Sequence, residues 1–375
     1  MKITLKRTPE QVELVKAMAS RNRNVAYEAQ VALAEFIGPV LAEVLNQAPT
    51  VSNLFQTLQF DADDNPSIPL DLYYNISDED YVQIWSQSHA GGLPSSQVLP
   101  TASELKLATY TLDSAVDFDR RYAAKSRMDV VSKTFTRVAQ NILIKQETTS
   151  ATLITSALAN ATTNGQDHVI GSSTAGRLIL DDLNRLLVAA KRINTSWIGG
   201  TPTERSRGVT DLMVSPEVVG DLRAMAYNPI NTVDSDGSAL AANQEGFAGP
   251  ESMRDELYRN AGIPTFYGLA IMELNELGVG QKFNTLYGTA AASGSTEAQT
   301  FTPATDEIVI GVDRTRDSMI RAVATDSESG GEFTLLADDQ YSIRQNKIGY
   351  YGSLEEGRMV LDDRALVGLI ASGVA

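Results

Sequence analysis

The longest regular pattern in the sequence covers residues 128 to 160. Its apolar residues recur at helical spacing: Met128, Val131, Phe135, Val138 and Ile142, continued by Leu153 and Ala157. No glycine or proline interrupts the stretch. At 1.5 Å per residue, one helix over this range is about 50 Å long, far longer than an average globular helix. The pattern therefore predicts a fold built along a single long helix.

Charges are distributed in blocks along the chain. Residues 24 to 105 contain no lysine or arginine, but they carry eleven acids: Glu28, Glu35, Glu43, Asp61, Asp63, Asp64, Asp71, Asp78, Glu79, Asp80 and Glu104. Basic stretches precede and follow this block, although the whole chain has a net charge of -16. Blocks of opposite sign favour contacts between copies of the chain. An acidic surface that only faces solvent is the alternative interpretation.

Composition restricts the class of protein. With 375 residues, 43% of them hydrophobic, the chain is long enough for two or three domains with a large core. It has no cysteine, which excludes disulfides, thiolate metal sites and cysteine nucleophiles. We expect neither a signal peptide nor a membrane-spanning stretch.

Two helices are predicted at the start of the chain. Residues 8 to 20 have Thr8 as N-cap and Pro9 in the first helical position. Residues 24 to 46 form the second, which Gly38-Pro39 is expected to kink or divide. Its predicted core stripe is Val25, Ala29, Ala32, Phe36 and Val40. Because both helices precede any strong core signal, they are expected to form an arm rather than a domain.

Strand patterns flank a long excursion. LFQTLQF from residue 54 and LKLATYTLDSAVDF from residue 105 have strand composition. The stretch between them is acidic and rich in proline, glycine and serine, with no amphipathic run that would build a core of its own. A loop of this length is either disordered or functional through contact with another molecule.

The second half alternates helix and strand. Asp181 is predicted to cap a helix that extends to Ile193, VTDLMV to form a strand, and Ser215-Pro216 to start the next helix. Residues 228 to 250 are predicted as a polar loop, 251 to 261 as a helix, 263 to 267 as a strand and 283 to 306 as largely loop. The remaining predicted strands are EIVIGV, SMIRAVATD, EFTLLAD, DQYSIRQNKIGYYG and RMVLDD.

Complete catalytic or binding motifs are absent from the sequence. GSSTAGRL, from residue 171, has the glycine spacing of a phosphate loop, but Arg177 and Leu178 replace its lysine and hydroxyl residue. The two histidines, His89 and His168, cannot form a three-histidine zinc site. We therefore predict no catalytic, cofactor-binding or metal site. An enzyme would have to use carboxylates, lysines and hydroxyls alone.

The order of these elements resembles that of the major capsid proteins of tailed bacteriophages, which have the Hong Kong 97 fold. Three stretches carry the resemblance: the helix at 181 to 193 followed by TDLMVSPEVVGDLRAM, then LYRNAGIPTFYG, and finally the C-terminal run from DEIVIGVDRTRDSMIRAVATD through DQYSIRQNKIGYYGSLEEGRMVLDDRALVGLIA. The resemblance implies an α+β fold with an N-terminal arm (1–53), an extended E-loop (54–118), a P-domain around a long spine helix (119–175 and 313–350) and an A-domain (176–312 and 351–375).

The function implied is that of a structural protein, not an enzyme. It would self-assemble through hexamers and pentamers into an icosahedral shell that encloses the double-stranded DNA genome, assembled in the host cytoplasm and found in the virion. The implied partners are a separate scaffolding protein, a portal, optionally a decoration protein, and DNA bound only non-specifically. No cofactor and no membrane are implied.

The charge blocks acquire a meaning from this resemblance. The acidic E-loop would lie on the basic flank of a neighbour's spine helix. The expected contact residues are Asp61, Asp63, Asp64, Asp78, Glu79, Asp80, Arg120, Arg121, Lys125 and Arg127. The basic residues of the arm would face packaged DNA or bridge to a neighbour's acids: Lys2, Lys6, Arg7, Lys16, Arg21 and Arg23.

Two alternatives remain open on the sequence. An encapsulin-type nanocompartment shares the fold and encloses a cargo enzyme instead of DNA. A carboxylate-dependent hydrolase would be a different class of protein, with a small oligomeric mass rather than the megadaltons of a shell.

Overall fold

The computed structural model describes residues 8–47, 50–61, 66–69, 104–163, 165–176, 178–193, 208–227, 265–266, 268–325, 332–338 and 346–373. Most of the excursion, the loop expected at 228–250 and the helix expected at 251–261 lie outside these residues. The described chain combines helices and sheets, which confirms the predicted α+β class. It divides into two compact units, the first made of Met1–Ile68, Leu105–Ser150 and Ile320–Met359, and the second of the rest.

The first unit is formed by segments from the start, the middle and the end of the chain. Its helices are α1 (Pro9–Met18), α2 (Arg23–Gln47), η1 (Val51–Leu54), α3 (Arg120–Ala124) and α4 (Met128–Asn160) as far as Ser150. Its strands are β1 (Gln56–Asp61), β4 (Tyr110–Asp119), β12 (Met319–Thr325), β13 (Thr334–Asp338) and β14 (Lys347–Val360). Short strands β2 (Ser67–Pro69) and β3 (Glu104–Lys106) pair at the two ends of the excursion.

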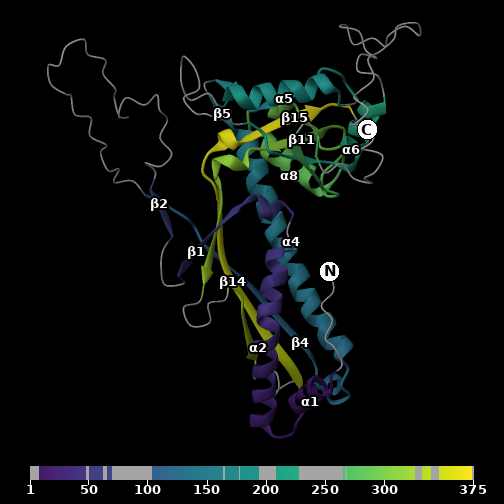
Figure 1. Cartoon of the computed structure of the whole chain (residues 1–375), viewed down its shortest axis with the longest axis vertical. Helices are drawn as coiled ribbons and strands as arrows, with labels where there is room; N and C mark the ends of the chain where they lie inside the picture. The colour runs from purple at the N-terminus through teal and green to yellow at the C-terminus, as the bar shows by residue number, and fades with distance from the viewer. Residues whose placement is uncertain are drawn as a thin grey trace, which may run out of the picture. The chain divides into compact units, whose positions relative to one another are not determined.

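A five-stranded sheet organises this unit. Its order is β1-β12-β14-β13, with β4 also paired to β14. The β4–β14 ladder is antiparallel and extends from Asp119↔Lys347 to Tyr110↔Glu356 (Figure 1). Strand β1 pairs with β12 in parallel. The strand before the long helix is therefore completed by a strand more than two hundred residues later in the chain.

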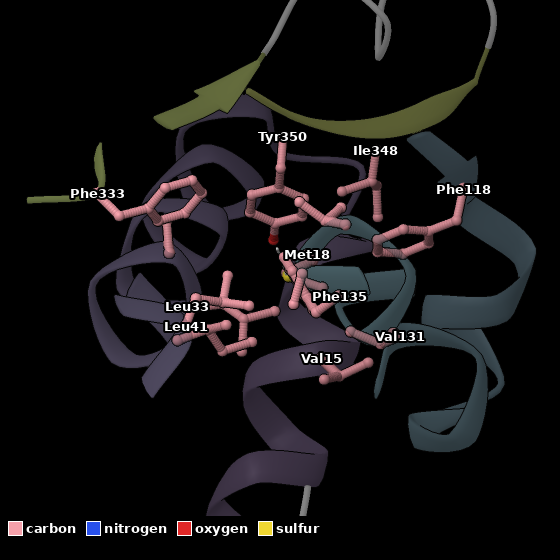
Figure 2. Packing of buried hydrophobic residues seen from close by; sticks show 14 of the residues in the cluster. Val15, Met18, Leu33, Leu41, Phe118, Val131, Phe135, Phe333, Ile348 and Tyr350 are labelled. Atoms are coloured by element: carbon pink, nitrogen blue, oxygen red, sulfur yellow. Dashed lines mark hydrogen bonds between the residues drawn. The ribbon is translucent and has the colours of Figure 1, made fainter. Parts of the chain in front are cut away.

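One hydrophobic core joins the sheet to α1, α2 and α4. Figure 2 shows Tyr350 of β14 at its centre, close to Phe118 of β4 and Phe135 of α4. The rings of Phe135 and Tyr350 meet edge to face with centroids 5.2 Å apart. The buried hydroxyl of Tyr350 donates to the sulfur of Met18, at 3.2 Å. A single hydrophobic core therefore holds α1, α2 and the long helix α4 together.

The prediction of one continuous long helix is confirmed, because α4 covers Met128–Asn160. The apolar residues that open its stripe are all buried: Met128, Val131, Phe135, Val138 and Ile142. In its last part the prediction was shifted by one residue. Ile154 and Leu158 are fully buried, whereas Leu153 and Ala157 are half-buried. An α-helix drifts against a strict seven-residue repeat, so a stripe extrapolated over several turns changes its register.

The first two helices also form as predicted. The side chain of Thr8 caps α1 by accepting from the backbone N–H of Gln11, at 3.4 Å. Pro39 lies inside α2 and does not divide it. Instead of forming a separate arm, both helices pack in the core of the first unit, with Val15 and Met18 of α1 buried.

The predicted core face of α2 was largely wrong. Its buried stripe contains Leu33, Ile37 and Leu41, while Phe36 is 52% exposed and Val25 and Val40 are also exposed. Ala29 alone of the predicted stripe is buried. The helix is apolar on nearly every side, so its sequence does not select the face that packs.

The expectation that no stretch is long enough to span a membrane also needs correction. Residues Arg23–Leu45 of α2, with a mean hydropathy of 1.3, have the length and composition of a membrane-spanning helix. One side of α2 is nevertheless part of the first unit's core, and Glu28, Glu35 and Glu43 lie on its surface. A core helix of this kind satisfies the same length and composition criteria.

The second unit contains a six-stranded mixed sheet in the order β7-β15-β11-β8-β10-β9. These strands are β7 (Val169–Gly171), β8 (Asp211–Val214), β9 (Thr265–Phe266), β10 (Leu269–Glu273), β11 (Glu307–Val312) and β15 (Leu366–Ala371). Every residue of β8, β11 and β15 is buried, as expected of central strands that read as continuous apolar runs. The described helices of this unit include α5 (Leu180–Ile193), α6 (Pro216–Tyr227) and α8 (Lys282–Ala291).

Shorter elements complete the second unit. They are strands β5 (Thr162–Thr163) and β6 (Gln166–Asp167), and the 3-10 turns η3 (Ala298–Thr300), η4 (Arg314–Arg316) and η5 (Asp363–Ala365). The start of α6 is confirmed, because the Ser215 hydroxyl accepts from the N–H of Val218, at 3.2 Å. The start of α5 differs from the prediction, since the helix begins at Leu180 and the buried Asp182 accepts from the N–H of Ile179.

Two further predictions were wrong in their elements. The stretch expected to be loop from residue 283 to residue 306 contains most of α8 and all of η3, and Phe283 and Tyr287 of α8 are buried. The strands expected at NKIGYYG and RMV are one strand, β14. Gly352 and Gly357 resembled turns in the sequence but lie inside β14, where close neighbours leave no room for a side chain.

Candidate functional site

Among the described residues, the oppositely charged side chains with the lowest exposure form ion pairs in the first unit. Glu356 and Arg358 of β14 are both fully buried in their side chains, and Arg321 of β12 is almost so. Residues two apart on a strand face the same side, which brings Glu356 and Arg358 together. Gly357 between them lies against β4, where a Cβ would come within 2.7 Å of the Ala108 carbonyl oxygen.

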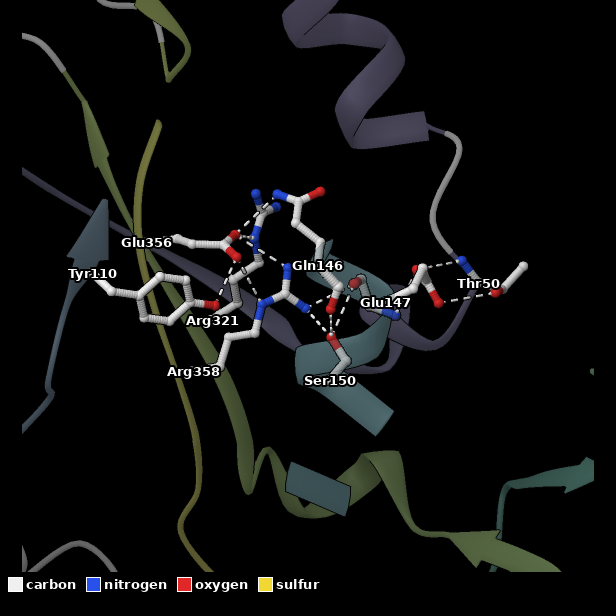
Figure 3. A network of polar contacts seen from close by, with 9 residues as sticks. Thr50, Tyr110, Gln146, Glu147, Ser150, Arg321, Glu356 and Arg358 are labelled. Carbon is white, nitrogen blue, oxygen red and sulfur yellow. Dashed lines mark hydrogen bonds and ion pairs between the residues drawn. The ribbon is translucent and has the colours of Figure 1, made fainter. Parts of the chain in front are cut away.

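The carboxylate of Glu356 accepts from four side chains (Figure 3). Arg321 Nε and Arg358 Nη2 approach it at 3.0 and 3.1 Å. The Tyr110 hydroxyl of β4 and the Gln146 amide of α4 donate to it at 2.9 and 3.0 Å. Three strands and the long helix are therefore joined at one carboxylate.

Arg358 extends the network to the segment between α2 and β1. Its Nη1 donates to the Ser52 hydroxyl at 2.7 Å and also to the Ser150 hydroxyl. Its guanidinium lies over the ring of Phe55, 5.6 Å from the centroid. The start of β1, from which the chain continues toward the excursion, is thus held to the same buried cluster.

The electrostatics of the cluster favour the ionised form of Glu356. Burial alone raises the pKa of this carboxyl, but Arg358, with its charge and hydrogen bonds, and then Arg321 and Tyr110 outweigh burial and lower it. Burial, followed by the negative charge of Glu356, raises the pKa of Tyr110 to about 12. Tyr110 is therefore a hydrogen-bond donor to Glu356 throughout the physiological range.

A second carboxylate caps the turn that follows α2. Glu147 of α4 accepts from the backbone N–H groups of Thr50, Val51 and Ser52, at 3.0, 2.9 and 3.3 Å. It also accepts from the Thr50 hydroxyl at 3.1 Å. These N–H groups open η1 and have no carbonyl partner within a helix, so a carboxylate is the favoured acceptor.

Replacing Glu147 by alanine is expected to lower the free energy of unfolding by about 3 kcal/mol, because it leaves partly buried N–H groups without an acceptor. Glu147→Gln keeps an oxygen acceptor and should cost less than half as much. Urea titrations of both variants followed by circular dichroism measure the difference. Equal losses for the two variants would contradict a capping role.

The cluster has no catalytic arrangement among its described members. Its guanidinium groups are matched to Glu356, and the hydroxyls of Ser52 and Ser150 are engaged by Arg358. It contains no histidine to act as a base. Among the residues described by the structure, no group of three or more histidines and acids is placed to hold a metal ion.

His168 has a structural environment in the second unit, and His89 lies outside the described residues. The ring of His168 is fully buried. Its Nδ1 lies 3.1 and 3.0 Å from the carbonyl oxygens of Asp363 and Leu366, so it carries the proton and donates. Its Nε2 accepts from the Thr163 hydroxyl at 2.8 Å. Both ring nitrogens are therefore occupied.

Glu307 is a buried carboxyl of the second unit that the sequence did not single out. It accepts from the Ser215 hydroxyl at 2.9 Å. Burial raises its pKa, the charges of Glu217 and Asp221 add to this, and the hydrogen bond from Ser215 lowers it. Ser215 also caps α6, so this contact connects a helix start to the central strand β11.

The cations predicted to meet an acidic loop cluster around α3. Arg120 is half-buried and its Nε donates to the Ala19 carbonyl oxygen at 3.3 Å, whereas Arg121 is exposed and pairs with Asp119 at 3.4 Å. Lys125 and Arg127 are exposed. Of the acids, Asp61 is exposed at the end of β1. Asp63, Asp64, Asp78, Glu79 and Asp80 lie outside the described residues.

The structure describes half of the predicted arm cations. Lys16, Arg21 and Arg23 are exposed, and Lys2, Lys6 and Arg7 lie outside the described residues. The buried network was missed by the sequence reasoning, although it had a signal. Arg321 lies inside the apolar run SMIRAVATD, and Arg358 opens the predicted strand RMVLDD. A charge within a buried strand requires a partner.

Comparisons with known proteins give similarities to solved structures alone. No family model matches the chain, and no curated protein does. The solved structures include the SrpI encapsulin complex from Synechococcus elongatus PCC 7942, at 14% identity over 86% of this chain and 87% of that chain, with a TM-score of 0.45. They also include the capsid of a native GTA particle (12%, 86% and 90%, TM-score 0.48) and the mature capsid of bacteriophage PhiM1 (11%, 86% and 86%, TM-score 0.47).

Other similar structures are described as the capsid of the cyanophage P-SCSP1u and as Gordonia phage Cozz and Microbacterium phage Oxtober96. Identities of 11–14% and TM-scores below 0.5 do not decide the fold or the function of this chain. A functional proposal therefore rests on the order of the elements in this chain and on the contacts of its described residues.

Proposed function

We propose that this chain is the repeating subunit of a closed protein shell, the major capsid protein of a tailed bacteriophage. One observation carries the proposal. Strand β14 pairs with β4 over ten residues, so the long helix and residues Ala151–Met319 of the second unit lie, in the sequence, between two strands that are neighbours in the sheet. This order, with the excursion before β4, is the order that the resemblance to the Hong Kong 97 fold implies.

The base of the excursion supports the same proposal. Strands β2 and β3 pair, and the N–H of Leu107 donates to the Pro66 carbonyl oxygen at 3.0 Å. The residues between them therefore leave and re-enter the first unit at one place. An insertion with a closed base and an acidic composition suits an E-loop that lies on another subunit. In such a shell the same heterologous contact recurs around each closed ring of subunits.

The double-stranded DNA genome would be the content of this shell. A net charge of -16 disfavours tight binding of DNA by the shell wall, which suits a genome that is packaged and later released. The arm cations Lys16, Arg21 and Arg23, together with Lys2, Lys6 and Arg7, would contact DNA non-specifically or bridge to acids of a neighbour. A scaffolding protein, a portal and a decoration protein are the remaining proposed partners. Assembly in the host cytoplasm is part of the same proposal.

An encapsulin-type compartment is the second candidate, because its subunit would have the same element order. The contents of the particle separate the two, since a phage head encloses DNA and an encapsulin encloses protein. A hydrolase is not favoured. The buried carboxylates of Glu356 and Asp182 accept hydrogen bonds from side chains and backbone of the fold itself and are held in structural roles.

The expected result of purifying the full chain, or the particle it forms, is a closed shell of megadalton mass in negative-stain electron micrographs. Nuclease treatment and gel analysis of the disrupted particles then distinguish a DNA content from a protein cargo. Monomers or small closed oligomers, in cells that make the complete set of phage proteins, would contradict the proposal.

Inter-subunit contacts are proposed between the acids Asp61, Asp63, Asp64, Asp78, Glu79 and Asp80 of one copy and Arg120, Arg121, Lys125 and Arg127 of the next. Each exposed pair contributes only about 0–1 kcal/mol, so repetition over many subunits has to supply the effect.

Reversing Asp78 and Asp80 to lysine is expected to lower the association constant about tenfold or more, because like charges would face each other across the contact. The subunit should keep its circular dichroism spectrum. Sedimentation velocity measures the association. A matched control reverses two exposed acids of the second unit, Glu273 and Glu276. Equal assembly of the two variants would contradict these contacts.

A further inference from the structure

One side of α2 is exposed to solvent and combines apolar with acidic side chains. Phe36 is 52% exposed, Val25 41% and Val40 40%. Glu28 and Glu35 lie on the same side of the helix and are exposed. We call this surface the α2 face. An apolar stripe of about 20 Å along a helix, with acids beside it, has the character of a docking surface.

The exposed face of α4 has the opposite charge. Lys133 and Arg137 are exposed, and Ile144 is 58% exposed. Together with Gln140, these residues follow steps of four, three and four and therefore lie on one side of the helix. We call this surface the α4 face. It presents two cations and a large apolar side chain over about 16 Å of helix.

These two faces cannot cover each other within one copy. The opposite side of α2 is buried through Leu33 and Ile37, and the opposite side of α4 through Phe135 and Val138. All four side chains belong to one hydrophobic core. Because both helices turn their buried sides toward the same core, their exposed sides point away from that core and do not cover each other.

We infer that the α2 face of one copy docks on the α4 face of a second copy. Apolar side chains are present on both, and the acids of one match the cations of the other. The contact joins two different patches, so it continues from copy to copy until a ring or shell closes. The inference deepens the proposed function and rests on it, because it names a contact by which shell subunits associate. The contact between the α2 face and the α4 face does not use the cations Arg120, Arg121, Lys125 and Arg127.

The test exchanges charges across the contact in the full-length chain. Reversing Glu28 and Glu35 to lysine, or Lys133 and Arg137 to glutamate, is expected to lower the association constant about 100-fold, because like charges then face each other. Combining both pairs of reversals in one chain restores complementarity and should recover association to within about tenfold of the wild type. Sedimentation velocity measures association, and circular dichroism with thermal melting checks that each variant is folded.

The outcomes separate this inference from the proposed function. A wild-type chain that never associates would overturn both. A wild-type chain that assembles, with variants that assemble equally well or a combined variant that does not recover, would overturn only the inference. Binding of the wild type to neutral phosphatidylcholine vesicles, lost in Phe36→Ser, would assign the α2 face to a lipid surface and overturn it as well. The Glu273→Lys and Glu276→Lys pair controls for the change in net charge.

Discussion

Replacing Glu356 by glutamine is expected to lower the free energy of unfolding of the first unit by about 3–5 kcal/mol. The substitution leaves Arg358 and Arg321 buried without their carboxylate. Removing one partner of a buried ion pair costs more than the pair itself contributes, because the remaining charge has lost its solvation by water. Hydrogen exchange of the β14 and β4 amides measures the loss in this unit alone.

The neighbouring Glu355 provides a matched control. It lies on the other side of β14 and is half-buried, so Glu355→Gln should change stability by no more than about 0.5 kcal/mol. The double variant Glu356→Gln/Arg358→Gln should lose less than the sum of the two single variants, because the two side chains interact directly. Additive losses would contradict the described network.

The same carboxylate gives stability a defined pH dependence. The pKa of Glu356 is lowered in the folded state, so its contribution is fully present above the unfolded pKa near 4.3 and is lost as pH falls toward the folded pKa. Glu356→Gln should therefore flatten the loss of stability of this unit as the pH falls below about 5. An unchanged slope would show that Glu356 is not held ionised by its partners.

Replacing Phe135 by alanine is expected to cost about 3–5 kcal/mol. Phe135 is fully buried, and its ring contacts Tyr350 at the point where α1, α4 and the sheet meet. Truncation removes the ring and leaves a cavity that the surrounding elements cannot fill without moving. Urea titration of the purified subunit measures the change.

A conservative replacement tests whether cavity formation is the cause. Phe135→Leu keeps most of the volume and should cost less than half of the alanine value. The exposed Gln140 of the same helix is a control for helix propensity, with an expected change within about 0.5 kcal/mol for Gln140→Ala. Similar losses for Phe135→Ala and Gln140→Ala would contradict the described packing.

The long helix could be predicted because its pattern has a single solution. Most of its apolar residues form one stripe, and no glycine or proline interrupts the helix. In α2, by contrast, apolar residues occur on several sides, so the sheet and α4 decide which side is buried. Helix α8 was missed because its asparagine, threonine and glycine residues have low helix propensity, and Tyr287 and Phe283 anchor it only through tertiary contacts.

The buried network could be predicted in part. A charged residue such as Arg321 in the middle of an apolar strand indicates that an oppositely charged partner lies nearby. The identity of that partner depends on strand register and on residues far away in the sequence. Gln146 is separated from Glu356 by 210 residues, and Tyr110 by 246. No local pattern connects such positions. The opposing surfaces of α2 and α4 likewise became visible only after the packed sides were known.

The pairing of β4 with β14 has a consequence for synthesis of the chain. The first unit needs residues as far as Met359, so it cannot close until β14 has left the ribosome. Closing a loop of that length is slow compared with the formation of local helices. Surfaces that belong to the completed unit are thus formed last. In the proposed shell subunit, contacts of the first unit with neighbouring copies would therefore become available only after β14 has been synthesised.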